Sequence, residues 1–272
     1  MNGGIRGTVR FFIVTIGIVG LTSLSIDATN GLQGSQSALS RLAGDWTSVG
    51  CASGTVPLEF RDTVYCVDAF AAAPSADCPY TDVRNTAHTA SNLSAAGCAA
   101  VSEAGSEPWT NIARHQAATA CARAGKRLLT PAEWYRSAVG TLASECNVAG
   151  NGARSTQDEV CQSGIGTFDM VGNVWELLDA EAVDGTYGDL RVPATGYVQE
   201  VNADGFPTAT GESPDDLFNA DYVWTNATGT YAMMRGGFYG SQDDAGVYTI
   251  HAAIEPNFTS QAIGFRCIER AS

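Results

Sequence analysis

The chain has 272 residues, of which 44% are hydrophobic, and a formal net charge of −14. This composition is sufficient for a folded core and argues against a largely disordered chain. An acidic surface repels phosphate backbones, so we expect no nucleic-acid partner.

The N-terminus has the pattern of an export signal. Arg6 and Arg10 precede an apolar run that is shorter than the ~20 residues of a membrane span and typical of a signal peptide. We predict a signal peptide over 1–28, a Gly- and Ser-rich linker over 29–45 and one domain over 46–272. An uncleaved anchor is the alternative. The expected location is the periplasm or the extracellular space of a bacterium, without membrane attachment after cleavage.

The first part of the domain alternates apolar and polar residues over 56–60 and 64–68. A period of two predicts short strands. Residues 71–106 contain prolines, glycines and two cysteines, and we expect a covalently stapled surface loop there.

Two helices are predicted next. Over 111–124, small and apolar residues recur at helical spacing, which turns Cys121 inward, and a glycine follows. Over 131–139, Thr130 at the N-cap and Glu133 three residues later form a capping box around a proline at the first helical position.

The rest of the chain is rich in glycine and turn residues, and we expect no helix of three turns there. Two helices followed by short strands and long loops predict an α+β fold. The strands are expected at 174–178, 222–224, 232–235, 248–252 and 264–268.

The chain has eight cysteines, an even number. In an exported protein this count predicts up to four disulfides, whose connectivity the count leaves open. No cysteine or histidine pair has the spacing of a zinc site, so a structural zinc is not expected.

Residues 166–176 form a glycine-rich turn with two acidic side chains. Calcium takes six to eight oxygens from carboxylates and exposed carbonyls. The turn offers the carboxylates of Asp169 and Glu176 and the carbonyls of Gly172 and Val174. A plain turn followed by a buried tryptophan is the alternative.

Four motifs in a fixed order resemble the formylglycine-generating enzyme, or sulfatase-modifying factor, family. The resemblance covers the chain from about residue 56 to the C-terminus, and it implies a C-type-lectin-like fold with much irregular loop. The motifs are GKRLLTPAEW (125–134), DMVGNVWE (169–176), RGG (235–237) and GFRC (264–267).

The resemblance also implies structural calcium. It assigns one ion to Asp169, Gly172, Val174 and Glu176. A second and weaker calcium site maps to Asn147 and Val148.

A disulfide between the first helix and the GFRC strand is a further implication of the resemblance, and it maps to Cys121–Cys267. We expect Cys146–Cys161 to staple the loop before the predicted calcium turn. The simplest remaining pairs are Cys51–Cys66 and Cys78–Cys98.

The chain departs from the family where the oxidase binds copper(I). Two cysteines follow RGG in the family, and counting from RGG these positions are Ser241 and Gly246. Soft thiolates suit copper(I), and neither residue supplies one. Basic residues that follow in the family are replaced by Tyr248, Ile250 and Ile254. We therefore expect no copper, no catalytic residue of the family type and no oxidase activity by the family mechanism.

We interpret the chain as a secreted monomer that binds a protein, peptide or glycan through the segment between RGG and GFRC, called here the 238–263 segment. Aromatic side chains give large contact areas at low entropy cost. One alternative is an active oxidase acting on a cysteine of sulfatases, and another is a variable receptor of a diversity-generating retroelement. The expected contact residues are Phe238, Tyr239, Ser241, Tyr248, His251 and Phe258.

Overall fold

The computed structural model describes residues 50–155 and 160–272, so the predicted signal peptide and linker lie outside the described residues. In these two ranges we find no helix with both the length and the apolar composition of a membrane span. The helices of these ranges are α3 (Thr86–Ser94), α4 (Arg114–Arg123), α5 (Pro131–Ala138) and the 3-10 turns η1 (Ala143–Glu145), η2 (Asp216–Phe218) and η3 (Gln242–Asp244).

The helices α4 and α5 confirm the two predicted helices. The capping box of α5 is formed as expected, because the Thr130 hydroxyl accepts from the Glu133 N–H at 3.3 Å and the Glu133 carboxylate accepts from the Thr130 N–H at 2.9 Å. Cys121 on α4 is fully buried. Both helices therefore form for the local reasons that the sequence displays.

The helix α3 corrects the expectation of a loop over 71–106. Asn85 caps this helix, and the buried residues of the helix are polar, namely Thr89 and Asn92. The Asn92 side chain bonds both the N–H and the carbonyl of Tyr80, at 2.9 and 2.8 Å. Because polar side chains anchor the helix, no apolar helical period marks it in the sequence.

The strands are short and lie mostly in the second half of the chain. They are β1 (Thr55–Phe60), β2 (Thr63–Asp68), β3 (Ala73–Pro74), β4 (Ala100–Val101), β5 (Arg127–Leu128), β6 (Trp175–Val183), β7 (Thr186–Tyr187), β8 (Leu190–Arg191), β9 (Gly196–Val201), β10 (Pro207–Gly211), β11 (Tyr222–Thr225), β12 (Thr230–Arg235), β13 (Ile250–Ile254), β14 (Ile263–Phe265) and β15 (Cys267–Arg270).

Two sheets organise these strands. The smaller has the order β1-β2-β15-β5, and the larger has the order β10-β9-β11-β13-β12-β6-β7-β8, with β14 added in parallel to β6. The strands β3 and β4 pair separately. Helices and mostly antiparallel strands in one unit confirm the α+β fold.

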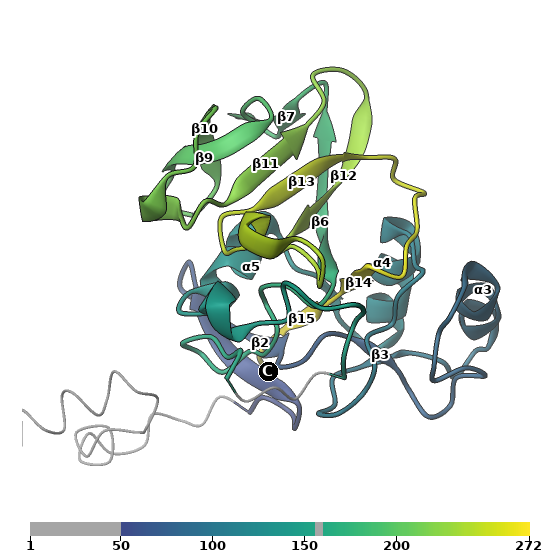
Figure 1. The fold of residues 1–272 in the computed structure, drawn as a ribbon. Helices are drawn as coiled ribbons and strands as arrows, with labels where there is room; N and C mark the ends of the chain where they lie inside the picture. The colour runs from purple at the N-terminus through teal and green to yellow at the C-terminus, as the bar shows by residue number, and fades with distance from the viewer. Residues whose placement is uncertain (1–49, 156–159) are drawn as a thin grey trace, which may run out of the picture. The chain divides into compact units, whose positions relative to one another are not determined.

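The GFRC segment joins the two sheets. The predicted strand 264–268 is in fact two strands, because β14 pairs with β6 of the larger sheet while β15 pairs with β2 and β5 of the smaller one. Figure 1 shows this segment in yellow between β2 and β6. Arg266 is the residue at which the chain passes from one sheet to the other.

The larger sheet has a hydrophobic cluster on each face. Met233 belongs to one cluster, with Trp134 of α5, while its neighbours Ala232 and Met234 belong to the other, with Cys121 of α4. The strand β6 contacts both helices. Alternation along β12 thus places the two helices on opposite faces.

Four disulfides are present, and they are the pairs that we expected. Cys121–Cys267 joins α4 to β15 and closes the longest loop, with a sequence separation of 146. The other three are Cys51–Cys66, Cys78–Cys98 and Cys146–Cys161. They include all eight cysteines of the chain, so no thiol remains.

Candidate functional site

The predicted calcium loop packs against the RGG motif and the loop at residue 147. Gly172 donates its N–H to the Gly236 carbonyl at 2.9 Å, and Asn173 donates to the Asn147 carbonyl at 2.8 Å. Gly172 has a φ of 73°, and a Cβ there would lie 2.5 Å from that Asn147 oxygen. Only glycine fits at this crossing, so the loop is fixed where three segments meet.

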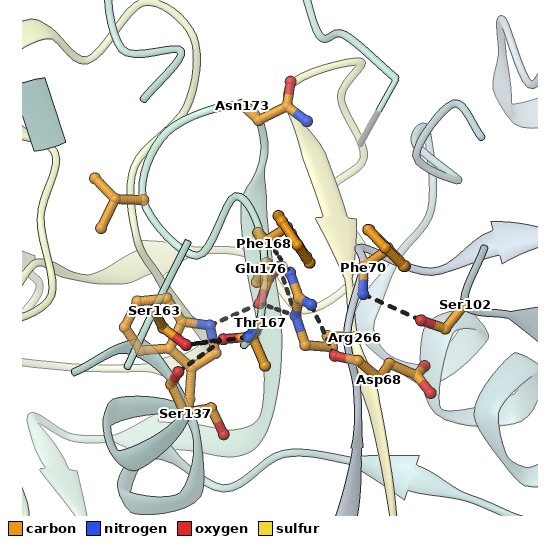
Figure 2. A network of polar contacts seen from close by, with 12 residues as sticks. Asp68, Phe70, Ser102, Ser137, Ser163, Thr167, Phe168, Asn173, Glu176 and Arg266 are labelled. Atoms are coloured by element: carbon orange, nitrogen blue, oxygen red, sulfur yellow. Dashed lines mark hydrogen bonds and ion pairs between the residues drawn. The ribbon is translucent and has the colours of Figure 1, made fainter. Parts of the chain in front are cut away.

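Glu176 is a buried carboxylate in β6 with hydrogen bonds to both oxygens. Trp134 Nε1 donates to Oε2 at 2.7 Å. Arg266 Nη2 donates to Oε1 at 2.8 Å, and its Nε lies 3.1 and 3.3 Å from the two oxygens. The side chains of Glu176 and Arg266 are each 1% exposed, and Figure 2 shows them facing each other. The charge of Glu176 is therefore balanced within the protein.

These contacts bear on the predicted calcium ligands. Asp169 is buried and has a left-handed φ of 54° in the same loop as Gly172 and Val174. Among the residues that the structure describes, no three His, Cys, Asp or Glu side chains gather as a metal site. Calcium at this loop, with Glu176 among its ligands, stays a prediction.

The weaker predicted calcium site uses its oxygens within the protein. Asn147 Oδ1 accepts from Arg154 Nη2 at 3.0 Å, and the Val148 carbonyl accepts from the Gln242 N–H at 2.8 Å. The first bond closes the 147–154 loop and the second ties it to the 238–263 segment. A second calcium ion there also stays a prediction.

Arg235 of the RGG motif is fully buried and has a structural role. Its guanidinium donates to the carbonyls of Pro131, Gly205 and Val247 at 3.0, 2.7 and 2.9 Å. It also lies over the Trp134 ring, 5.2 Å from the centroid. Arg235 thus fixes the point at which the 238–263 segment begins.

The two positions that correspond to the family's copper cysteines have other roles here. Ser241 Oγ accepts from the Phe238 N–H at 3.0 Å and closes a turn. A Cβ at Gly246 would lie only 1.8 Å from Asp221 Oδ1. Asp221 is held there because its Oδ2 accepts from the Tyr248 N–H at 2.6 Å, and burial raises the pKa of this carboxyl.

Four of the six predicted contact residues meet at one groove of about 280 Å³. Phe258 is its most exposed large apolar side chain, at 50%, and buried Trp175 and Met234 also line it. The four residues are Phe238, Tyr239, His251 and Phe258.

His251 is neutral in this groove at pH 7. Its ring lies 5.5 Å from the Trp175 ring and 5.4 Å from the Trp224 ring, between centroids. Burial lowers the pKa of His251 to about 4. The groove is therefore largely aromatic and uncharged, and its polar side chains include the neutral imidazole, Ser260 and Gln261.

The other two predicted contact residues lie elsewhere. Tyr248 packs against Tyr135 and Phe218, with ring centroids 5.6 and 5.4 Å apart, and belongs to the cluster of α5. Ser241 lines a separate hollow of about 380 Å³ with Tyr197. The structure thus brings together four predicted residues and leaves these two outside the groove.

The sequence analysis did not single out Trp224 or Asp221. Tyr222 and Trp224 lie on the same face of β11 and alternate with buried Val223, and the Trp224 ring stacks on His251. The period of two in that strand was therefore an available signal. No local signal marks Asp221, because its partner Gly246 comes from a loop far along the chain.

Most of the chain is similar to a known domain family. The family model described as "Sulfatase-modifying factor enzyme 1-like domain" matches residues 63–271. No curated protein sequence matches. Among solved structures, the Major Tropism Determinant M1 variant is 15% identical with a TM-score of 0.47, and the match covers 81% of this chain and 55% of that one.

Two further similar structures come from named bacteria. Treponema denticola variable protein 1 is 13% identical with a TM-score of 0.43, over 81% of this chain and 93% of that one. PvdO from Pseudomonas aeruginosa is 14% identical with a TM-score of 0.43, over 77% of this chain and 81% of that one. This chain spans little more than half the length of the Major Tropism Determinant chains, 55% for the M1 variant.

Proposed function

The chain belongs to the sulfatase-modifying factor enzyme 1-like family, whose model matches residues 63–271, and we propose that it is an exported binding module without the family's copper oxidase chemistry. Export is supported by the four disulfides, which persist in oxidising compartments. The signal peptide over 1–28, the linker over 29–45 and the domain over 46–272 are part of this proposal.

The observation that carries the proposal is the lack of space at Gly246. The Asp221 carboxylate lies where a cysteine side chain would begin, 1.8 Å from an added Cβ. Asp221 cannot easily withdraw, because its Oδ2 accepts from Tyr248 and its carbonyl accepts from Val198. The carboxyl oxygens of Asp221 are also hard donors that suit copper(I) poorly.

The groove supports a binding role. Its lining is mostly aromatic and aliphatic, with His251 as a neutral polar group, which is the usual composition of a ligand site. The groove shares Tyr239 and Gln261 with a polar hollow of about 330 Å³. An apolar side chain of a protein or peptide would enter the groove while its backbone meets the polar hollow.

The loss of oxidase chemistry is tested by titrating thiols in the native protein and by competing for copper(I) with a chromogenic chelator. We expect no reactive thiol and no stoichiometric copper, because every cysteine is in a disulfide. The reduced and denatured protein, whose eight cysteines then react, serves as the positive control for thiol detection. Two reactive thiols with one bound copper in the wild type would overturn the proposal.

The binding role is tested with a displayed library of random peptides selected on the wild type, followed by titration of the selected peptides by fluorescence polarisation. Phe258→Ala should weaken binding at least about tenfold, since a central aromatic anchor contributes about 2 kcal/mol or more. Leu217→Ala is the matched control, because Leu217 is 82% exposed and does not line the groove. Equal affinity for the wild type and Phe258→Ala would refute the use of this groove.

The alternative that the chain is a variable receptor of a diversity-generating retroelement is tested by the sequence around its gene. A near-copy of the coding region for the 238–263 segment, beside a reverse transcriptase gene, would support it. A genomic neighbourhood with neither feature would remove it.

A further inference from the structure

Asn151 and Gly152 form an Asn-Gly pair in the 147–154 loop, where the asparagine is exposed. We propose that Asn151 is a site of spontaneous deamidation, at which the asparagine is converted to a mixture of aspartate and isoaspartate. The inference concerns the chemistry of this loop and does not depend on the binding role proposed above.

The reaction uses only the two residues and water. The backbone nitrogen of Gly152 attacks the side-chain amide carbon of Asn151, and the new C–N bond closes a cyclic succinimide. The side-chain nitrogen of Asn151 leaves as ammonia and takes the proton of the Gly152 N–H with it. Water then opens the ring at one of its two carbonyls, which gives aspartate or isoaspartate. Each conversion adds one carboxylate, and no oxidant, reductant or enzyme takes part.

The first argument is that the two reacting groups are free of hydrogen bonds. Within residues 50–155 and 160–272, neither the Asn151 side chain nor the Gly152 N–H is hydrogen-bonded. The Gly152 carbonyl, by contrast, accepts from Asn147 Nδ2 at 3.0 Å. The loop is thus held at an atom that the reaction does not use, while the attacking nitrogen and the attacked amide break no bond when they meet.

The second argument is the open space around Gly152. A Cβ built on Gly152 would meet no atom within 4 Å, and the 147–154 loop belongs to no helix or strand. Glycine also adopts backbone conformations that other residues rarely reach. The nitrogen can therefore move toward the Asn151 amide without displacing a neighbouring segment, which is what ring closure requires.

The third argument is the contrast between Asn151 and the buried asparagines. Asn92 and Asn173 are 0% and 1% exposed. The Asn92 side chain bonds the N–H and the carbonyl of Tyr80, and the Asn173 side chain bonds the N–H and the carbonyl of Arg154. Neither is followed by glycine. These two residues give the chain its own comparison for a slow reaction.

The product would change the polar hollow beside the groove. Asn151 lines this hollow together with Asp82, Glu107 and Tyr239, so a new carboxylate makes the hollow more acidic. Gly150 donates its N–H to the Tyr239 carbonyl at 2.6 Å. Because isoaspartate lengthens the backbone by one carbon, it also alters the loop next to the bond that ties it to the 238–263 segment.

The experiment incubates the folded wild-type protein at pH 8 and 37 °C and follows each asparagine by peptide mapping with mass spectrometry. We expect Asn151 to deamidate at least about tenfold faster than Asn92 and Asn173, which is a difference of about 1.4 kcal/mol in the barrier. Isoaspartate should be detected at Asn151 by enzymatic methylation. The intact protein should also form a species that binds an anion exchanger more tightly.

A second measurement uses a variant that should fold as the wild type does. Gly152→Ala fits the open space but restricts the backbone that must close on the amide, so deamidation of Asn151 should slow at least about tenfold. Gly50→Ala, at another glycine with no atom within 4 Å, is the matched control and should leave the rate unchanged. The proposal is overturned if Asn151 reacts no faster than Asn92 and Asn173, or if Gly152→Ala leaves its rate unchanged.

Discussion

The RGG and GFRC motifs and the 238–263 segment between them are adjacent in the chain and differ in how they use their side chains. Arg235 and Arg266 are 0% and 1% exposed, and their guanidinium groups donate to backbone carbonyls of distant segments. Between them, Phe258 is 50% exposed and a groove opens beside it. The motifs that reveal the family therefore hold the fold together, while the proposed binding groove lies against the segment between them.

The largest effect on stability should come from removing the Cys121–Cys267 disulfide, which anchors the GFRC motif. We expect the Cys121→Ala/Cys267→Ala variant to lose about 5 kcal/mol in the free energy of unfolding, because the bridge closes a loop with a separation of 146 residues. Guanidinium unfolding without reductant measures this loss. Cys146→Ala/Cys161→Ala, with a separation of 15, should lose about 3 kcal/mol. Equal losses would contradict a special anchoring role for GFRC.

The next largest effect is on the stability that neutral His251 contributes in the groove, and it depends on pH. Burial lowers the pKa of His251 to about 4, below the value of about 6.5 in an unfolded chain, so the unfolded state binds the proton first as the pH falls. The stability that the neutral ring contributes is complete above about pH 6.5 and is lost, by about 3 kcal/mol at most, as the pH falls to about 4.

This prediction is checked by unfolding the wild type and His251→Phe at pH 7.5 and pH 4.5. The wild type should lose more stability than the variant between the two pH values. His115→Phe is the control, since His115 is exposed on α4, and it should follow the wild type. The same pH dependence in all three proteins would show that His251 is not the group responsible.

A smaller effect on stability is expected at Gly246, which corresponds to one of the family's copper cysteines. Gly246→Ala places a Cβ 1.8 Å from Asp221 Oδ1, and such overpacking costs about 1–3 kcal/mol. Gly152→Ala, which meets no atom within 4 Å, should change stability by less than about 0.5 kcal/mol. Chemical denaturation of both variants gives the comparison. A neutral Gly246→Ala would mean that Asp221 yields easily, and the argument against a thiolate there would weaken.

The smallest effect on stability should be at the exposed aromatic residue. Phe258→Ala should stay within about 0.5 kcal/mol of the wild type, while its peptide binding falls as described above. Phe265→Ala in GFRC, at a fully buried ring, should cost about 3–5 kcal/mol. Thermal melts of the pair separate an interaction residue from a core residue, and a large loss in Phe258→Ala would remove the distinction.

Much of the fold follows from local sequence patterns. The capping box at Thr130 and Glu133 predicts α5, and the alternation at 222–224 and 232–235 predicts strands that the structure contains. The strands β9 and β10 were not predicted. They pair with each other and expose polar residues such as Gln199 and Glu200 in part, so their apolar alternation is weak.

The sequence likewise predicts only part of the candidate site. The order of four motifs indicates the family, and the missing cysteines at Ser241 and Gly246 can be read directly from the chain. The oxygens of Glu176, by contrast, meet Arg266 across a separation of 90 residues. Asp221, just before β11, meets Gly246 in the loop before β13. Such pairings have no local pattern.

The sequence by itself determined the family, the α+β class and the loss of the copper thiolates, because these depend on residue identity and on short-range spacing. Only the tertiary structure decided that Glu176 is neutralised by Arg266 and that Asp221 fills the space at Gly246. It also decided that four aromatic and imidazole side chains of the 238–263 segment share one groove with Trp175. The physical reason is that charge balance, free volume and exposure depend on which distant segments are packed together.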